Sequence, residues 1–279
     1  MKSKISLSVL LFCLIFVLAG CSGVVSPISE ENQEENVTDE WLSIENEFFI
    51  IEYCFGYEND TEKILDYCNF ARNTVMSKYP HKLPYKPTVL VYDRLHWSLS
   101  EWMMITYCGS TSGEIHALAP SDQTNPYYDT LWYQKNIIHE YTHLPFYHDL
   151  YAKPQGYRDC PDWFNQGLAE YFAMFCSTSS ILQKYEQKLS EIKNMVKNGN
   201  GYLVYVGEDV YYGGAYIVKY MYEVYNQDKV VTLIKSSALS FSQAINKELN
   251  VTSGEFEDEW LKWACKEFDA DYEQLYAPE

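Results

Sequence analysis

The residues whose types and spacing point most directly to chemistry are His139, Glu140 and His143, in the segment His-Glu-Tyr-Thr-His. They lie at the end of a run, from about residue 130 to 144, that can form a helix. At 3.6 residues per turn, His139 and His143 lie one turn apart on one helix face, so both imidazoles can reach one metal ion. Glu140 points to the side of that ion, where a water would lie. This H-E-x-x-H pattern predicts a zinc ion held by the two histidines, with Glu140 as the general base.

A third protein ligand is expected, because a catalytic zinc usually has three such ligands and one open position. Glu170 follows His143 by 27 residues, on a second predicted helix that spans residues 162–175 with Asp162 as its N-cap. We therefore expect Glu170 to be the third ligand, and one zinc ion per chain.

The downstream segment carries a resemblance to a known family. Residues 163–171 read Trp-Phe-Asn-Gln-Gly-Leu-Ala-Glu-Tyr, and together with H-E-x-x-H they resemble the gluzincin metallopeptidases, in particular the peptidase-MA-like branch. The resemblance is concentrated in the two motifs and extends loosely over residues 85–265. It implies a zinc-dependent peptidase in which the last Glu of the motif, Glu170, binds the metal. Gln166 stands where the family pattern has an acid, which would change substrate preference rather than zinc binding.

The resemblance also implies a fold and further site residues. The expected fold is α+β and zincin-like: a small, mostly antiparallel sheet beside the motif helix, followed by a helical C-terminal half. Residues 113–118 would form the edge strand that pairs with an extended substrate, so Gly113, Ile115 and Ala117 are the expected substrate-binding residues. Tyr212 would donate a hydrogen bond to the oxyanion of the intermediate. Two alternatives stay open: that the neighbouring Tyr211 has this role instead, and that Tyr212 is purely structural.

The N-terminus has the pattern of an exported lipoprotein. A basic start and an apolar run from Ile5 to Val17 precede Leu-Ala-Gly-Cys21, which resembles a bacterial lipobox. We expect a signal peptide over 1–20, a lipid on Cys21, a disordered acidic tether over 21–44 and a catalytic domain over 45–279. The alternative, an uncleaved membrane anchor, is disfavoured because the apolar run is short of the roughly 20 residues that span a bilayer. The expected location is the extracytoplasmic face of the cell membrane.

The net charge and the spacing of the cysteines limit the kinds of partner and metal site that we expect. Losing Lys2 and Lys4 with the signal peptide would take the formal charge from −18 to −20, which disfavours nucleic acid. Six cysteines lie beyond Cys21 without a C-x-x-C pair, so a cysteine zinc site is not expected. Disulfides stay open, except that Cys160 and Cys176 flank the predicted 162–175 helix, and sixteen helical residues would hold them about 24 Å apart.

Hydrophobic periodicity and breaker residues predict the remaining elements. Pro145 is expected to end the motif helix. The predicted strands span 48–53, 88–92 and 113–119, and the predicted helices span 61–78, 98–104, 180–197, 216–226, 229–235, 241–249 and 256–263.

Two other functions are compatible with these patterns. One is a surface lipoprotein that has lost catalysis and binds a peptide or a protein partner. The other is an envelope protein without a metal, in which the histidines are incidental. Substrate, the choice between endo- and exopeptidase action, and oligomeric state are not determined by the sequence.

Overall fold

The computed structural model describes residues 41–93, 97, 104–108, 111–121, 129–151, 156, 159–201 and 210–276. The chain divides into two units, Met1–Thr38 and Asp39–Glu279, and all described residues belong to the second. The predicted signal peptide and Cys21 therefore lie outside the described residues. Strand β1 begins at Trp41, four positions before the predicted start of the domain at residue 45. Among the described residues, no helix is long and apolar enough to cross a membrane.

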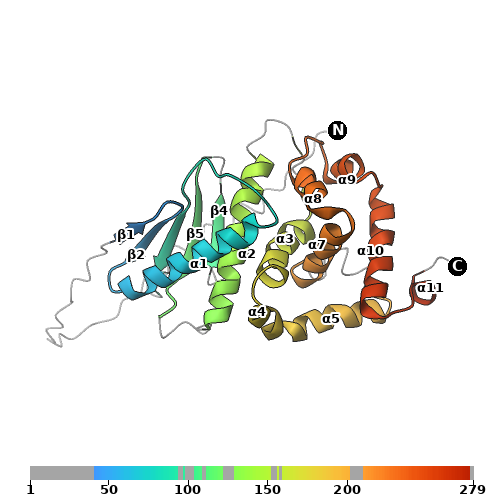
Figure 1. The fold of residues 1–279 in the computed structure, drawn as a ribbon, viewed down its shortest axis with the longest axis horizontal. Helices are drawn as coiled ribbons and strands as arrows, with labels where there is room; N and C mark the ends of the chain where they lie inside the picture. The colour runs from blue at the N-terminus through green and yellow to red at the C-terminus, as the bar shows by residue number, and fades with distance from the viewer. Residues whose placement is uncertain are drawn as a thin grey trace, which may run out of the picture. The chain divides into compact units, whose positions relative to one another are not determined.

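A five-stranded sheet forms the N-terminal part of this unit, in the order β1-β2-β3-β5-β4 (Figure 1). The pairs β2–β3 and β3–β5 are parallel, whereas β1–β2 and β4–β5 are antiparallel. The strands are β1 (Trp41–Glu45), β2 (Ile50–Cys54), β3 (Thr88–Tyr92), β4 (Met104–Cys108) and β5 (Gly113–Leu118). The expectation of a mostly antiparallel sheet is wrong. Helix α1 (Glu58–Met76) lies between β2 and β3 in the chain and returns it to the same end of the sheet, so these two strands run in the same direction.

The edge strand differs from the prediction. Strand β5 is paired on both sides, and the side chains of Ile115 and Ala117 are fully buried. Gly113 is buried as well, and a Cβ added there would lie 2.8 Å from Leu144. Assigning substrate pairing to Gly113, Ile115 and Ala117 was therefore wrong. The strand at this end of the sheet is β4, whose first residue had been assigned to a short helix over 98–104.

Most of the described residues outside the sheet are helical, so the structure is α+β with a mixed sheet and a mostly helical C-terminal half, compatible with a zincin-like fold. Helices α1 and α2 pack against each other and against the sheet, and α3 packs most extensively on α7 (Figure 1). The helices are α1 (Glu58–Met76), α2 (Thr130–Tyr151), α3 (Asp162–Phe175), α4 (Ser179–Lys184), α5 (Glu186–Lys197), α7 (Tyr212–Val224), α8 (Asn226–Ile234), α9 (Phe241–Leu249), α10 (Ser253–Phe268) and α11 (Tyr272–Leu275).

Helix α2 continues through Pro145 to Tyr151, so the prediction that Pro145 ends it is wrong. An interior proline loses one backbone hydrogen bond and costs about 3 kcal/mol. Burial on both sides of the proline offsets this cost, because Leu144, Phe146 and Leu150 are at most 3% exposed. The Tyr79 hydroxyl also donates a hydrogen bond of 3.2 Å to the carbonyl of Pro145. Tertiary packing here outweighs a local helix-breaking signal.

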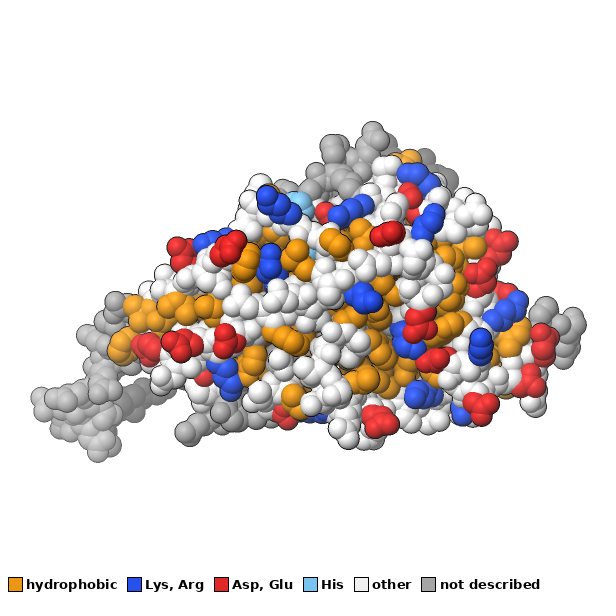
Figure 2. All heavy atoms as spheres, in the orientation of Figure 1, with side chains coloured by type: hydrophobic (Ala, Val, Ile, Leu, Met, Phe, Trp, Pro, Cys, Tyr) orange, Lys and Arg blue, Asp and Glu red, His pale blue; other side chains and the backbone are white. Residues whose placement is uncertain are grey.

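On the face that Figure 2 shows, acidic and basic side chains are interspersed rather than gathered into one acidic region.

Cys160 and Cys176, which are not expected to form a disulfide with each other, are both free thiols.

The close crossing of α3 and α7 depends on two glycines that face each other. A Cβ added to Gly167 would lie 2.4 Å from the backbone of Gly214, and one added to Gly214 would lie 2.3 Å from the Trp163 carbonyl oxygen. Contacts this short force the two helix backbones apart, so only glycine fits at either position.

We predict that Gly167→Ala or Gly214→Ala lowers the free energy of unfolding by about 2 kcal/mol or more, because overpacking must displace a backbone. The matched control is Gly254→Ala on α10, where an added Cβ meets nothing within 4 Å. That control should change stability by less than about 1 kcal/mol. Urea unfolding of the three variants measures the difference. Equal effects at all three positions would contradict the close crossing.

Candidate metal centre

Helix α2 brings the two motif histidines together on one face, as the spacing predicts. The Nε2 atoms of His139 and His143 lie 3.2 Å apart, and each residue is only 5% exposed. Two nitrogens bound to one tetrahedral zinc at 2.0–2.1 Å would lie about 3.3 Å apart. The separation of the two imidazole nitrogens therefore fits a single zinc ion.

The outward-facing nitrogens of the two rings meet oxygens from α3. Nδ1 of His143 lies 3.1 Å from Oδ1 of Asn165, which can only accept, so this Nδ1 carries the proton. Burial first and the neighbouring His139 second lower the pKa of His143 to about 3, so its ring is neutral near pH 7. Nδ1 of His139 lies 3.3 Å from Oε1 of Glu170, without the alignment of a hydrogen bond. A partner such as Asn165 holds the His143 imidazole with Nε2 directed toward a metal.

Gln166 provides the third atom that converges with the two imidazoles. Its Oε1 lies 3.1 Å from Nε2 of His139, and its side chain also interacts with His143. Nδ1 of His143 carries the proton, and with the same tautomer at His139 two nitrogen lone pairs and one amide oxygen would face one another. Three acceptors at this spacing fit a cation, so these residues suit zinc, with a donor set that carries no formal charge.

Glu170 occupies a different place from the one expected for a direct ligand. It lies on the Nδ1 side of His139, and its Oε1 is bound by the Lys135 ammonium of α2. Burial would raise the pKa of Glu170, but Lys135 and His139 together hold it at about 2, so the carboxylate is charged. Among the described residues, no group of three or more His, Cys, Asp and Glu side chains is arranged to hold a metal. The set of His139, His143 and Glu170 is therefore not assembled in this geometry, whereas His139, His143 and Gln166 do converge.

Glu140 lies beside this centre and is positioned by the edge strand. The Thr106 hydroxyl of β4 lies 2.8 Å from Oε2 of Glu140 and 3.0 Å from the Glu140 carbonyl oxygen. Burial raises the pKa of Glu140, while the neighbouring His139 and the hydrogen bond from Thr106 oppose the rise. A carboxylate whose pKa is raised in this way is a better proton acceptor than one in water.

Two tyrosines at the start of α7 close the site from the other side. The ring of Tyr211 stacks on His139 at 5.9 Å between centroids. Tyr212 lies further along, with its ring 5.9 Å from the Lys135 ammonium and 6.4 Å from the ring of Tyr185. Both line the cleft, and the ring of Tyr211 contacts a motif histidine.

These side chains line a cleft of about 570 Å³ between β4, α2, α3 and the start of α7. Sequence reasoning did not find Thr106, Lys135 or Asn165, and it gave Gln166 no role in holding metal. One signal was present for Lys135, which precedes His139 by four residues and so lies on the same helix face. Thr106 had no such signal, because strand pairing places it beside α2.

Comparison with protein-family models and with curated protein sequences found no match. Among solved structures, the chain is similar to a crystal structure of a two-domain M1 zinc metallopeptidase mutant bound to L-arginine, with 11% sequence identity and a TM-score of 0.37. The matched region covers 81% of this chain and 51% of that one. The chain thus spans about half the length of the protein that it matches.

We predict that Lys135→Met lowers the free energy of unfolding by about 3 kcal/mol, because the charge of Glu170 is then buried without its partner. Adding Glu170→Gln should recover much of the loss, since the buried charge is removed as well. Urea unfolding in the presence of a chelator measures both effects. Additive losses in the double variant would contradict a coupled pair.

The buried ion pair between Lys135 and Glu170 also makes the free energy of unfolding depend on pH. The pKa of Glu170 falls from an ordinary value of 4.5 to about 2 on folding. Its contribution is therefore complete above pH 4.5 and decreases as the pH falls toward 2. Between these pH values, the Lys135→Met/Glu170→Gln variant should lose less stability than the wild type, with both measured by urea unfolding.

Proposed function

We propose that this chain is a zinc-dependent hydrolase of peptide bonds in which Glu140 is the general base. The observation that carries the proposal is the convergence of two imidazole nitrogens and the Gln166 oxygen beside a buried carboxylate, in a cleft next to a sheet edge. These are the components that metal-assisted hydrolysis requires.

Each residue has a role in this proposal. His139, His143 and Gln166 would hold zinc, which when bound acts as a Lewis acid and lowers the pKa of water to about 7. Glu140, oriented by Thr106, accepts the proton of the attacking water and passes it to the leaving amine. Lys135 and Glu170 keep His139 in its orientation. Tyr211 or Tyr212 would donate a hydrogen bond to the oxyanion, and the contact between Tyr211 and His139 favours Tyr211.

The proposed substrate is a peptide or protein segment in extended form. Strand β4 is the last strand of the sheet on the side of the cleft. Its residues Met104, Ile105 and Thr106 line the cleft. An extended peptide can add to such an edge by backbone hydrogen bonds, with its carbonyl directed to the metal centre. The proposal keeps the lipid on Cys21 as the anchor that holds this domain at the outer face of the membrane.

A second candidate function is a peptide-binding protein without turnover. It is favoured by Gln166, because an amide oxygen has no net charge and holds zinc less strongly than a carboxylate. Partial or absent metal loading would leave the cleft and the edge strand able to bind a peptide but unable to cleave it.

We predict that Glu140→Gln reduces hydrolysis of a peptide library by a factor of about 100 or more, because general-base catalysis contributes about 10²–10⁴. Zinc content should stay unchanged, since Glu140 is not among the converging donors. The matched control is Glu191→Gln on the exposed face of α5, which should keep full activity. Undiminished cleavage by Glu140→Gln would sink the peptidase proposal, and no cleavage by a zinc-loaded wild type would favour the peptide-binding alternative.

Metal binding separates the two possible third ligands. If Gln166 is the ligand, Gln166→Glu should tighten zinc binding by about tenfold or more, because it adds a negative charge at the metal. Glu170→Ala should then weaken binding by about 10–100-fold, as loss of an outer partner does. Competition with a chromogenic chelator measures both affinities. If Gln166→Glu changes nothing and Glu170→Ala abolishes binding, Glu170 is the ligand after all.

A further inference from the structure

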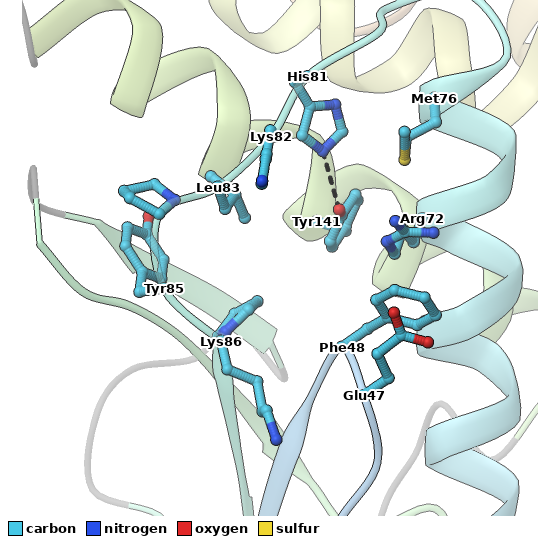
Figure 3. Close-up of a pocket in the computed structure, with 12 residues that line it drawn as sticks. Glu47, Phe48, Arg72, Met76, His81, Lys82, Leu83, Tyr85, Lys86 and Tyr141 are labelled. Carbon is cyan, nitrogen blue, oxygen red and sulfur yellow. Dashed lines mark hydrogen bonds between the residues drawn. The ribbon is translucent and has the colours of Figure 1, made fainter.

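A second hollow lies against α2 on a different face from the metal centre. It has a volume of about 510 Å³ and shares no lining residue with the cleft described above. Tyr141, the residue after Glu140, forms one wall, so the same helix borders both cavities (Figure 3). The other walls come from the β1–β2 turn, α1 and the segment before β3, and include Phe48, Arg72, Met76, Lys82, Leu83 and Tyr85.

The hollow is basic although the chain as a whole is strongly acidic, at −18. Three basic side chains line it, against the single acid Glu47. Lys86 is paired with Glu45 at 2.9 Å. Within the described part of the chain, no carboxylate lies at ion-pair distance from Arg72 or Lys82, which project toward the hollow from different sides (Figure 3). Two positive charges therefore face one cavity without an ion-pair partner among the described residues, and Glu47 is the acidic side chain that also lines it.

Arg72 is held in a geometry that suits anion binding. The centre of its guanidinium lies 3.7 Å from the centroid of the Phe48 ring, so the planar group rests on an aromatic surface. Stacking leaves the N–H groups at the edge of the guanidinium available, and these match the two oxygens of a carboxylate or phosphate. Because the group is already positioned, less side-chain entropy is lost when an anion binds.

The part of the wall formed by His81 and Tyr141 is fixed and uncharged. Nδ1 of His81 donates to the Tyr79 carbonyl oxygen at 2.8 Å, and its Nε2 accepts from the Tyr141 hydroxyl at 2.9 Å. Burial lowers the pKa of His81 to about 4; among its charged neighbours, Asp149 raises this pKa while Arg72 and Lys235 lower it further. With both ring nitrogens engaged and the ring neutral, the charge available to a ligand comes from Arg72 and Lys82.

We propose that this hollow binds a small organic anion, with its carboxylate or phosphate held between Arg72 and Lys82 and its apolar part against Met76 and Leu83. The two side chains supply charge from separate segments, and the partly buried Met76 and Leu83 supply an apolar surface next to it. This site is independent of the metal centre and of the function proposed for it.

The test is calorimetric titration of the full-length chain with phenyl phosphate, benzoate and inorganic phosphate at constant ionic strength. A chelator is present throughout, so that phosphate cannot bind through zinc. Phenyl phosphate or benzoate should bind, and phenyl phosphate should bind more tightly than inorganic phosphate. Arg72→Met and Lys82→Met should each weaken binding by about tenfold or more, because each removes a charged donor.

The matched control is Lys78→Met, which removes the same charge from an exposed position outside the hollow. It should change the affinity less than about twofold. Lys82 is exposed, so Lys82→Met keeps the proposal testable if Arg72→Met does not fold. The absence of binding by all three probes at about 10 mM, or equal weakening by Lys78→Met, would overturn the site. Equal affinity for phenyl phosphate and inorganic phosphate would overturn the organic ligand.

Discussion

The buried pair between Lys135 and Glu170 is the interaction on which the arrangement of the metal centre depends. It joins α2 to α3 inside the protein, where neither charge could remain without the other. Oε1 of Glu170 is engaged by Lys135 and lies beside Nδ1 of His139, so this oxygen is on the other side of the imidazole from the point where the two Nε2 atoms meet. The residue one turn earlier on α3, Gln166, faces that point instead. The ion pair thus places a carboxylate oxygen beside the Nδ1 side of His139, and a neutral amide oxygen lies at the third position.

The helices around this pair are held by packing rather than by local sequence preference. Gly167 and Gly214 allow α3 and α7 to approach closely, which brings Gln166 and the tyrosines at the start of α7 to the same cleft. Helix α2 continues through Pro145 because its flanking side chains are buried. Different faces of α2 border the two cavities: His139, Glu140 and His143 line the cleft, and Tyr141 borders the basic hollow. A change in either cavity therefore acts on the same rigid element.

Several elements were predictable from sequence because a local signal specified them. The strands at 88–92 and 113–118 follow from short apolar runs, and the helices at 162–175 and 241–249 follow from periodicity between breaker residues. The predictions that failed needed non-local information. Strand β4 exists because it pairs with β5, and the sheet is mixed because α1 returns the chain to its starting end. The predicted helix over 180–197 is two helices that meet at Tyr185.

For the candidate site, the sequence by itself determined that two imidazoles share one helix face with a carboxylate to their side, because four residues make about one turn and this geometry is local. It also determined that α3 carries Gln166 and Glu170 one turn apart. Only the tertiary structure decided which of these two oxygens meets the Nε2 atoms, that Thr106 holds Glu140, and that the sheet ends at β4. Those outcomes depend on how α2, α3 and the sheet pack against one another. The physical reason is that burial and charge pairing act between segments distant in sequence, where residue spacing carries no information.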